Sequence, residues 1–416
     1  MVERMATTVC VAGGGPAGMM LGLLLARAGV EVAVLEKHTD FFRDFRGDTI
    51  HPSTLDVLEQ LGLRSRLDGI PHTSVSSLDA VVKGVRMTPV SFSSLHRGAR
   101  ELVLMPQWDL LDLLASAAKE LPTFHLLMGA EATGLRRHGD TVTGVTASTT
   151  RGTLEIDAGL TVAADGRSSR LRDASGLPVH EYGVPIDVLW FRLPRPVQNP
   201  PDTIAYITDS SVMITIPRPD YYQTAMLIPK GSLAEIRRRG LPAFRRSVVD
   251  TVPFLEPSVE DLTDWDDVKL LTVQINRLSR WHQPGLLLVG DAAHAMSPAF
   301  GVGINYAIQD AVAAANLLVG PLRAGSLTEA DLARVQHRRE RAVRKMQAIQ
   351  LWLHKVVARP GGGANMPSAR TLRLVSAVVP PLVRPLTARL IGRGFRPERI
   401  EGHVLQGGVR SGAPTV

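Results

Sequence analysis

The feature that most constrains the fold is a glycine-rich turn near the start of the chain. The apolar run 8–12 leads into Gly13-Gly14-Gly15-Pro16-Ala17-Gly18, and a helical pattern then ends near Gly29 before a second apolar run over 30–35. Apolar runs without alternation predict strands that are buried on both faces. The order strand, turn, helix, strand therefore predicts a β-α-β unit that opens a parallel sheet.

The spacing of this turn is that of a dinucleotide-binding site. Gly13 permits the tight turn, Gly15 lets the backbone approach a pyrophosphate, and Gly18 lets the helix pack closely on the strand. The N-terminus of the helix offers N–H groups to an anion, and Glu36 at the end of the second strand can accept from a ribose hydroxyl. A plain glycine-rich turn is the alternative, and the pattern alone does not distinguish FAD from NAD.

A second glycine-rich segment lies far downstream and favours FAD. The apolar run 286–289 ends in Gly290-Asp291-Ala292-Ala293-His294, and Pro298, Gly301 and Gly303 precede an alanine-rich helical pattern. A carboxylate at a strand end can bind a sugar-alcohol hydroxyl, and glycines that open a helix can bring backbone N–H groups to a ring edge that becomes negative on reduction. A reduced flavin needs this environment, whereas an ordinary strand-to-helix turn is the alternative.

With the segment Asp165-Gly166-Arg167-Ser168-Ser169-Arg170-Leu171-Arg172, these motifs form a three-part signature. The signature resembles that of the para-hydroxybenzoate hydroxylase family of group A FAD-dependent aromatic monooxygenases. The resemblance implies an α/β fold: an FAD-binding Rossmann-like domain of the glutathione-reductase type, an inserted mixed β-sheet substrate domain and C-terminal helices. It also implies that Asp291 contacts the ribityl or pyrophosphate region, Glu36 the adenosine ribose, and the backbone of Gly301 and Gly303 the isoalloxazine.

Further site residues follow from the same resemblance. Arg46 falls in a loop that lies near the flavin in relatives, with Arg43 as a competitor, and Pro298 would lie over the flavin face, so Arg46 and Pro298 are the candidate catalytic residues. Gln107 stands where many relatives have an arginine, and for His294 a structural role is favoured over proton transfer. The predicted cofactor-binding residues are Gly13, Gly15, Pro16, Ala17, Gly18, Glu36, Lys37, Arg46, Gln107, Asp165, Asp291, Pro298, Gly301, Gly303, Ile304 and Asn305.

The pattern of segments along the chain predicts how its domains are arranged. Between 179 and 273 short alternating runs are separated by Pro, Asp and Gly, which is typical of a mixed sheet, with a helix expected over 233–252. The predicted parts are 1–178, the first part of the FAD-binding domain, with about 75–104 contributing to the substrate side; 179–273, the substrate-binding domain; 274–350, the second part of the FAD-binding domain; and 351–416, a C-terminal helical segment. Candidate substrate contacts in the insertion are Trp190, Arg192, Tyr206 and Tyr222, although aromatic residues in strands often only pack.

Composition excludes several other classes of protein. The net charge of +7 in 416 residues is not arranged as a basic track interleaved with aromatics, so no nucleic-acid partner is expected. The basic stretch 334–345, with Arg338, Arg339, Arg341 and Arg344, is interpreted as a solvated helix face. The single cysteine, Cys10, allows no intrachain disulfide and fits a cytoplasmic location. Prolines and arginines interrupt the apolar run 372–392, so no membrane span is expected, and no metal-ligand cluster appears.

The resemblance also implies a mechanism. NAD(P)H would reduce FAD, O2 would add to give a flavin C4a-hydroperoxide, and the distal oxygen would pass to a small aromatic or polyketide-like substrate. The alternatives are a flavin-dependent halogenase, whose Trp-x-Trp-x-Ile-Pro segment is not matched by Trp190-Phe191-Arg192-Leu193-Pro194, an NAD-dependent dehydrogenase, and a non-catalytic flavin-binding protein. The substrate, the choice between NADH and NADPH, and whether the protein is a monomer or a homodimer stay open.

Overall fold

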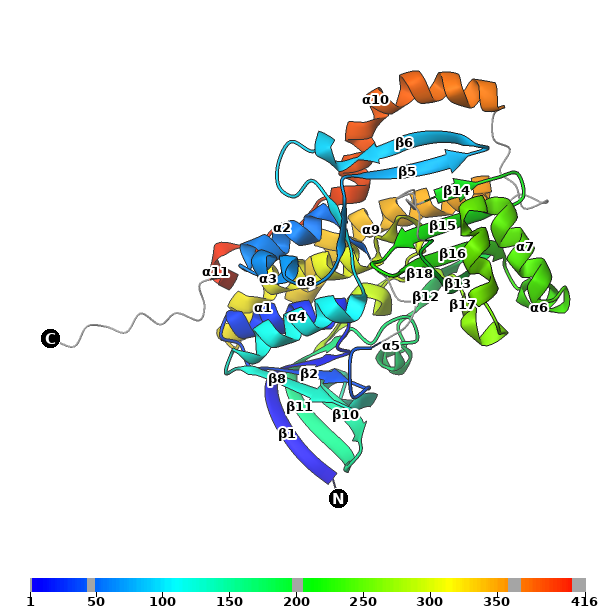
Figure 1. Ribbon diagram of the computed structural model, residues 1–416. Coiled ribbons are helices and arrows are strands. Elements are labelled where there is room, and N and C mark those ends of the chain that lie inside the picture. The colour runs from blue at the N-terminus through cyan, green and yellow to red at the C-terminus, as the bar shows by residue number, and fades with distance from the viewer. Residues whose placement is uncertain (1, 43–48, 197–204, 358–367, 406–416) are drawn as a thin grey trace.

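The computed structural model describes residues 2–42, 49–196, 205–357 and 368–405. The chain forms a mixed α/β fold in which an eight-stranded and a seven-stranded sheet carry most of the strands. Figure 1 shows the two sheets in different parts of the molecule, with a long helix arching over the edge of the seven-stranded sheet.

The eight-stranded sheet contains the glycine turn predicted from the sequence. Its strands, in spatial order, are β19 (His282–Gln283), β20 (Leu286–Leu288), β11 (Gly152–Ala163), β1 (Val2–Ala12), β2 (Val32–Glu36) and β8 (Phe124–Met128), with β10 (Thr141–Thr149) paired to β11 and β9 (Glu131–His138) paired to β10. The neighbours from β20 to β8 run parallel. Parallel strands place all their carboxyl ends at one edge of the sheet, and the motifs follow those ends.

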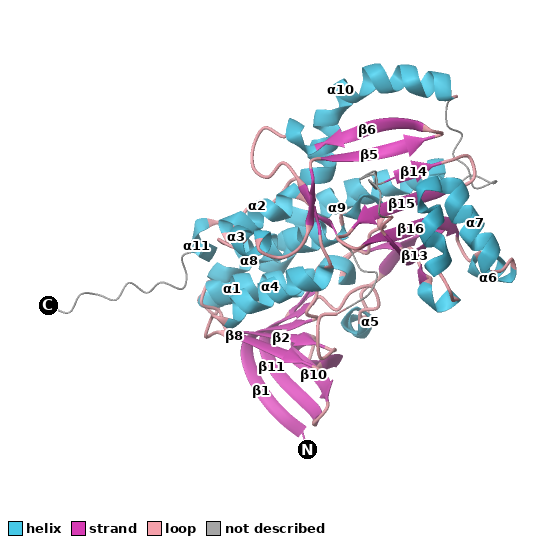
Figure 2. Cartoon of the chain, viewed as in Figure 1, coloured by secondary structure: helices cyan, strands magenta, loops and turns pink. Residues whose placement is uncertain are grey.

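Alternate residues of β1 enter different layers, as a strand buried on both faces requires. Val9 and Val11 pack in the core with α1 (Pro16–Arg27), α4 (Gln107–Lys119) and α8 (Gly303–Arg323), whereas Cys10 and Ala12 pack in a second core with residues of β9, β10 and α9 (Glu329–Val357). Figure 2 shows α1, α4 and α8 as one helical layer beside the strands. Burial raises the pKa of the Cys10 thiol to about 12, which makes it an unreactive core residue.

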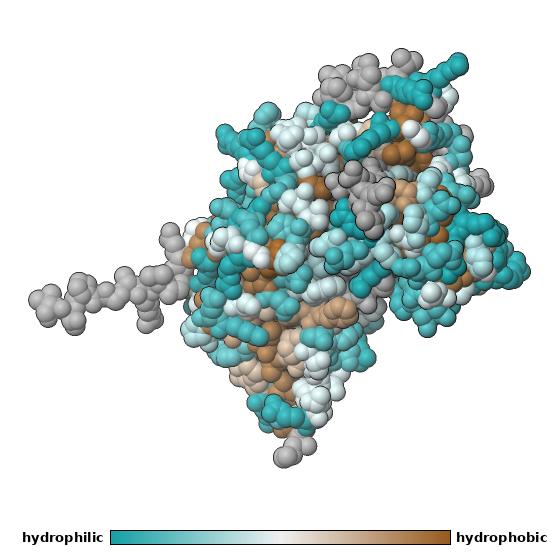
Figure 3. All heavy atoms as spheres, viewed as in Figure 1, coloured by the Kyte–Doolittle hydropathy of each residue, from teal (hydrophilic) through white to brown (hydrophobic). Residues whose placement is uncertain are grey.

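The seven-stranded sheet brings together two distant parts of the chain. In spatial order its strands are β17 (Lys269–Leu271), β13 (Ile186–Pro194), β16 (Tyr221–Pro229), β15 (Val212–Pro217), β14 (Ala205–Ile207), β5 (Ser77–Val82) and β6 (Val85–Ser91). One face packs against α7 (Leu241–Thr251) and the 3-10 helix Pro253–Asp261. Figure 3 shows hydrophilic side chains covering the lobe that α7 forms with α6 (Leu233–Arg238).

The single helix expected over 233–252 is wrong. The chain forms α6 and α7 instead, and they are separated at Gly240, whose φ of +86° lies in the left-handed region and cannot continue an α-helix. The boundary expected at 350 falls inside α9, which is continuous from Glu329 to Val357. The domain boundaries themselves stay a prediction.

Smaller elements connect the two large sheets. The short strands are β3 (Thr49–Ile50), β7 (Leu102–Leu104) and β4 (Thr73–Val75) in one sheet, and β12 (Val179–Tyr182) and β18 (Ile275–Leu278) in another; the short helices are α2 (Pro52–Gln60), α3 (Arg64–Asp68), α5 (Arg170–Ser175) and α11 (Gly402–Leu405). The arching helix of Figure 1 is α10 (Ala369–Arg393), which packs along β6. One described helical stretch, Ala299–Arg323, is long and apolar enough to cross a membrane, but 89% of its most apolar 18-residue window is buried inside the fold, as in the core helix of a globular protein.

Candidate functional site

The candidate site lies at the carboxyl edge of the eight-stranded sheet. β1 ends in the first glycine turn, β2 ends at Glu36, and β11 is followed by Asp165. β20 is followed by Gly290 and Asp291, so all three sequence motifs meet at one edge. The connection from β1 runs through α1 to β2 on one side, while β11 and β20 lie on the other. Ligands of open α/β sheets bind at such a switch point.

The three glycines of the first turn have different surroundings. Gly13 has a φ of +111°, and a Cβ there would lie 2.3 Å from the carbonyl oxygen of Ala164. A Cβ on Gly18 would lie 1.9 Å from the carbonyl oxygen of Gly13, so this glycine is needed for helix packing. Gly15 differs, because a Cβ on it would meet nothing within 4 Å. The protein itself therefore leaves open space at the glycine of this turn that is predicted to approach the pyrophosphate.

The start of α1 is prepared to bind an anion. Gly15 is the N-cap and provides no side-chain hydrogen bond, and Pro16 opens the helix. The first-turn N–H groups are thus left for a ligand. Ala17 is buried. Glu36 accepts hydrogen bonds from the N–H groups of Gly14 and His38, each at 3.1 Å, which places its carboxylate beside the turn.

The loop after β20 packs directly on α1. Gly290 has a φ of +59°, and a Cβ there would contact the Cβ atoms of Ala17 and Ala307 at 3.3 and 3.4 Å. Asp291 accepts a hydrogen bond from Arg167 at 3.0 Å, and its side chain is 30% exposed. The first and third motifs are therefore in contact, and Asp291 presents a partly exposed carboxylate at the carboxyl edge of the sheet.

A buried carboxylate behind this loop holds it in place. Asp310 on α8 accepts from the N–H of Gly290 at 3.1 Å, lies 2.6 Å from Nε2 of His294, and accepts from Nε of Arg339 at 3.0 Å. Burial alone would raise the pKa of Asp310, but His294 and Arg339 together lower it below its usual value. The ring of His294 packs on Trp281. These contacts favour the structural role expected for His294.

The interpretation of the stretch 334–345 as a solvated face is wrong for Arg339. Its side chain is 1% exposed, because Asp310 and Glu398 compensate its charge in the interior. Arg341 and Arg344 are exposed, as expected. Helical spacing alone could not identify which arginine points inward, since both partners lie elsewhere in the chain.

The start of α8 is the second place where backbone is left accessible. A Cβ on Gly303 would meet nothing within 4 Å, and the helix has no side-chain cap. Gly301 is different: its φ is +62° and a Cβ would lie 2.1 Å from Oγ1 of Thr49. Ile304 is buried. The side chain of Asn305 accepts from the N–H of His51 at 2.9 Å and from Thr54 Oγ1 at 2.7 Å, which ties α8 to α2.

Two other predicted cofactor residues have different surroundings. Both carboxylate oxygens of Asp165 accept hydrogen bonds within its own loop, from Ser169 Oγ at 2.5 Å and from the N–H of Leu171 at 3.2 Å. Burial raises the pKa of this carboxyl. Gln107 is the first residue of α4 and half-buried. Asp165 therefore shapes the start of α5, and any contact with a cofactor would come through that loop.

Of the three remaining predicted residues, the structure describes two. Pro298 precedes the short 3-10 helix Ala299–Gly301, where its carbonyl accepts from the N–H of Gly301 at 2.9 Å. Lys37 is exposed beside Glu36. Arg46 lies outside the described residues, so its predicted place near the flavin stays a prediction.

The seven-stranded sheet separates the four candidate substrate residues into two pairs. Trp190 packs with Ile214 and Phe300 on the face that looks toward the α8 loop. Arg192 follows two residues along β13, on the same face. Tyr206 and Tyr222 pack on the opposite face, each against Phe254 of the 3-10 helix. The sheet stands between these two tyrosines and the cofactor edge, so only the first pair is placed to meet a ligand there.

The structure adds residues that the sequence did not single out. Phe300 has a φ of +66°, rare for a bulky residue, beside Pro298. Gln223 lies opposite Arg192 in the register of β13 and β16 and is buried. Its Nε2 and the indole Nε1 of Trp190 are buried without a hydrogen-bond partner among the described residues. Strand alternation could have indicated Gln223, whereas the backbone of Phe300 had no signal in the sequence.

The residues at this edge fit an FAD molecule. Two uncapped helix N-termini begin at glycines beside open space, and a half-buried carboxylate, Asp291, lies at the strand end between them. The first helix suits a pyrophosphate, and the second suits a ring edge that gains negative charge. The carboxylate suits the hydroxyls of the connecting sugar alcohol.

Several known proteins and solved structures are similar to this chain. A family model described as an FAD binding domain matches residues 6–349. The chain is 31% identical over 375 residues to 6-methylpretetramide 4-monooxygenase of Streptomyces rimosus, which covers 89% of each protein. It is 27% identical over 318 residues to 12-dehydrotetracycline 5-monooxygenase/anhydrotetracycline 6-monooxygenase of the same species, which covers 73% of this chain and 61% of that longer protein. The solved structure of PqsL, a probable FAD-dependent monooxygenase from Pseudomonas aeruginosa, has the same fold, with a TM-score of 0.72 and 22% identity over 84% of this chain and 96% of that one.

Proposed function

Because the chain belongs to the family of FAD-dependent aromatic monooxygenases, we propose that it uses NAD(P)H and O2 to hydroxylate a small aromatic or polyketide-like molecule. The names of the relatives support the substrate class, since one is named for 6-methylpretetramide and another for 12-dehydrotetracycline and anhydrotetracycline. The choice between NADH and NADPH is left to experiment.

The observation that carries this proposal is the pair of open helix starts at Gly15 and Gly303, with Asp291 between them. FAD, when bound, supplies the redox chemistry, taking two electrons from NAD(P)H and activating O2. The chain would hold the pyrophosphate at the start of α1 and the adenosine ribose at Glu36. It would hold the sugar alcohol at Asp291 and the ring at the start of α8.

Substrate would lie between the α8 loop and the inner face of the seven-stranded sheet. Phe300, Ile214 and Ile216 make this region apolar, which suits a planar ring system and excludes water from the reaction. The N–H groups of Trp190 and Gln223 are donors, so they suit a ring substituent that accepts hydrogen bonds, such as a carbonyl or phenolate oxygen. Pro298 and Arg46 are the proposed catalytic contacts on the flavin side.

The test is substrate-stimulated oxygen transfer. FAD-loaded protein would be mixed in air with NADH or NADPH and with phenols and hydroxylated polycyclic aromatics. We expect that one class of aromatic accelerates NAD(P)H oxidation and gains one oxygen atom, traced with isotopically heavy O2. Asp291→Ala should bind FAD more weakly, so both effects should be reduced in this variant when FAD is not added in excess. Reversible nicotinamide turnover without FAD would instead support a dehydrogenase, and a chlorinated product in chloride buffer would support a halogenase.

A further inference from the structure

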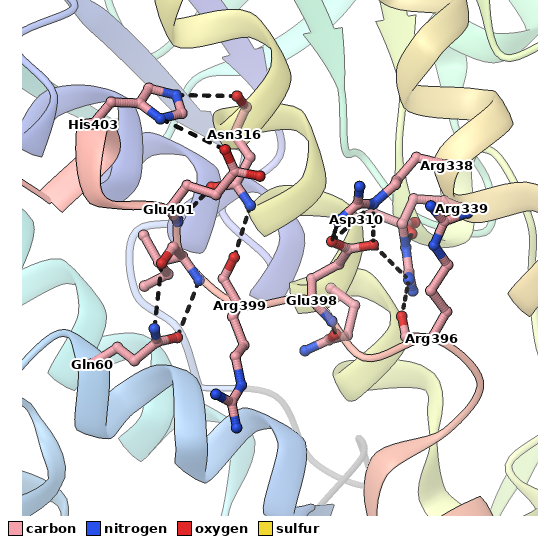
Figure 4. Close-up of polar contacts among 12 residues, drawn as sticks. Gln60, Asp310, Asn316, Arg338, Arg339, Arg396, Glu398, Arg399, Glu401 and His403 are labelled. Carbon is pink, nitrogen blue, oxygen red and sulfur yellow. Dashed lines mark hydrogen bonds and ion pairs between the residues drawn. The ribbon is translucent and has the colours of Figure 1, made fainter.

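The chain returns to the cofactor-binding half of the molecule after α10. We call residues 394–405 the C-terminal strap. The side-chain amide of Gln60 on α2 makes two hydrogen bonds to the backbone of Ile400 in the strap. Its Nε2 donates to the carbonyl at 3.3 Å, and its Oε1 accepts from the N–H at 3.0 Å. The side-chain amide of Asn316 on α8 binds the two residues that flank Ile400: it donates to the carbonyl of Arg399 at 2.8 Å and accepts from the N–H of Glu401 at 3.0 Å. Figure 4 shows these amide side chains reaching the strap from both helices.

Glu398, which lies between α10 and the residues bound by Gln60 and Asn316, places its carboxylate in the interior. Glu398 is 2% exposed. It accepts from Arg338 at 2.8 to 3.1 Å in a bidentate geometry and lies 3.5 Å from Nη1 of Arg339. Its own N–H donates to Gln309 on α8. A buried carboxylate with this many partners is fixed in one orientation.

Arg339 connects Glu398 of the strap to Asp310, which lies behind the loop at the carboxyl edge of the eight-stranded sheet. Its Nε donates to Asp310 at 3.0 Å and its Nη1 to the carbonyl of Arg396 at 3.2 Å, and it is the only residue of this group in contact with both carboxylates among the described residues. Asp310 in turn holds the N–H of Gly290. Arg339 is buried between the two carboxylates, whereas the side chain of Arg338 is 37% exposed. Removing the charge of Glu398 therefore leaves only one of these two carboxylates, Asp310, to compensate the buried Arg339. Figure 4 shows Asp310, the two arginines and Glu398 as one group.

We propose that Glu398 is a positioning residue for FAD, acting through Arg339 and Asp310 on the loop Gly290-Asp291. The C-terminal strap thus helps to position the cofactor-binding loop, although the strap begins more than 100 residues after that loop. This inference rests on the proposed binding of FAD at the carboxyl edge. The strap also continues directly from α10, whose residues Ala388 and Ile391 pack with Phe300 and Trp190. Cofactor binding is thereby linked to the wall proposed for the substrate.

The test compares two glutamates of the same strap. Glu398→Gln removes the buried charge, whereas Glu401→Gln changes a side chain that is 54% exposed and whose carboxylate lies 3.7 Å from the ring of His403. FAD is titrated into each apoprotein, and binding is read from flavin fluorescence and from the visible circular dichroism of the bound flavin. We expect the Kd for FAD to rise at least tenfold in Glu398→Gln with an altered flavin spectrum, and to change less than twofold in Glu401→Gln.

A merely structural role would lower the unfolding midpoint of the apoprotein but leave the Kd and the flavin spectrum unchanged, and that result would overturn the proposal. If Glu398→Gln yields no folded protein, Glu398→Asp replaces it in the test, because aspartate keeps the negative charge on a side chain that is one methylene group shorter. It should bind FAD several-fold more weakly than wild type, and wild-type affinity there would equally count against the proposal. Failure of wild-type protein to bind FAD would refute the proposed function instead, so the two ideas fail separately.

Discussion

Gly15→Ala separates the cofactor from the fold better than any other change at the first turn. The residue has a φ of −75° and a ψ of −176°, which alanine adopts without strain, and the added methyl group meets no protein atom within 4 Å. The apoprotein should therefore keep its stability or gain up to about 1 kcal/mol, because alanine restricts the unfolded chain. The same methyl group would point into the space assigned to the pyrophosphate.

The cost to binding can be estimated from the N–H groups at the start of α1. If the methyl group displaces the pyrophosphate from even one of them, the loss is about 1.5–3 kcal/mol for a hydrogen bond to a charged group. That corresponds to a rise of roughly 10- to 100-fold in the Kd for FAD. The assay is a fluorescence titration of apoprotein with FAD, paired with urea unfolding of the same samples.

Two other glycines calibrate this result. A Cβ on Gly134 of β9 would also meet nothing within 4 Å, but this residue lies away from the site, so Gly134→Ala should leave the Kd for FAD unchanged and affect stability about as much as Gly15→Ala. Gly18→Ala should destabilise the apoprotein by about 1–3 kcal/mol or more, because its methyl group would lie 1.9 Å from a carbonyl oxygen. Wild-type FAD affinity in Gly15→Ala would refute the reasoning, and so would an apoprotein destabilised as much as Gly18→Ala.

Three further predictions concern single residues. Asp291→Ala should raise the Kd for FAD by roughly 10- to 100-fold, whereas Asp173→Ala, which removes a carboxylate that is 74% exposed, should not; equal affinities in a titration would show that Asp291 does not bind the cofactor. Burial lowers the pKa of His51 to about 4, so the unfolded chain takes up a proton as pH falls below about 6.5 while the folded chain does not, and stability falls over that window. From pH 7 to pH 5, wild type should therefore lose about 2 kcal/mol more of its free energy of unfolding than His51→Gln does. The measurement is urea unfolding at both pH values, and parallel pH profiles for the two proteins would contradict this prediction. Trp190→Phe keeps a ring but loses the indole N–H, so KM for an oxygen-bearing aromatic should rise roughly three- to tenfold with FAD affinity unchanged; an unchanged KM would remove Trp190 from the proposed pocket.

The family and the cofactor could be predicted from the sequence because their signals are local. Gly13, Gly15 and Gly18 lie within six residues of one turn, and the close neighbour that excludes a side chain at Gly18 is the carbonyl of Gly13 in the same turn. Parallel strands then bring distant turns to one edge by a general rule of topology. The comparisons confirm the family that these motifs indicated.

The surroundings of individual side chains required the tertiary structure. Tyr206 and Tyr222 belong to strands with the expected character, but the packing of α7 and the 3-10 helix Pro253–Asp261 determines that they lie away from the cofactor edge. Asn305 matched a cofactor motif, yet its amide joins α8 to α2.

The C-terminal strap shows the same limit for charged residues. Arg339 belongs to a basic stretch typical of a solvated helix face, but it is buried between Asp310 and Glu398. Local spacing determines which backbone can turn or bind a phosphate, because the atoms involved are neighbours in the chain. Whether a side chain meets solvent, another charge or a ligand depends on residues that lie far apart in the chain, 29 and 59 positions away in the case of Arg339, and only the packed structure brings those together.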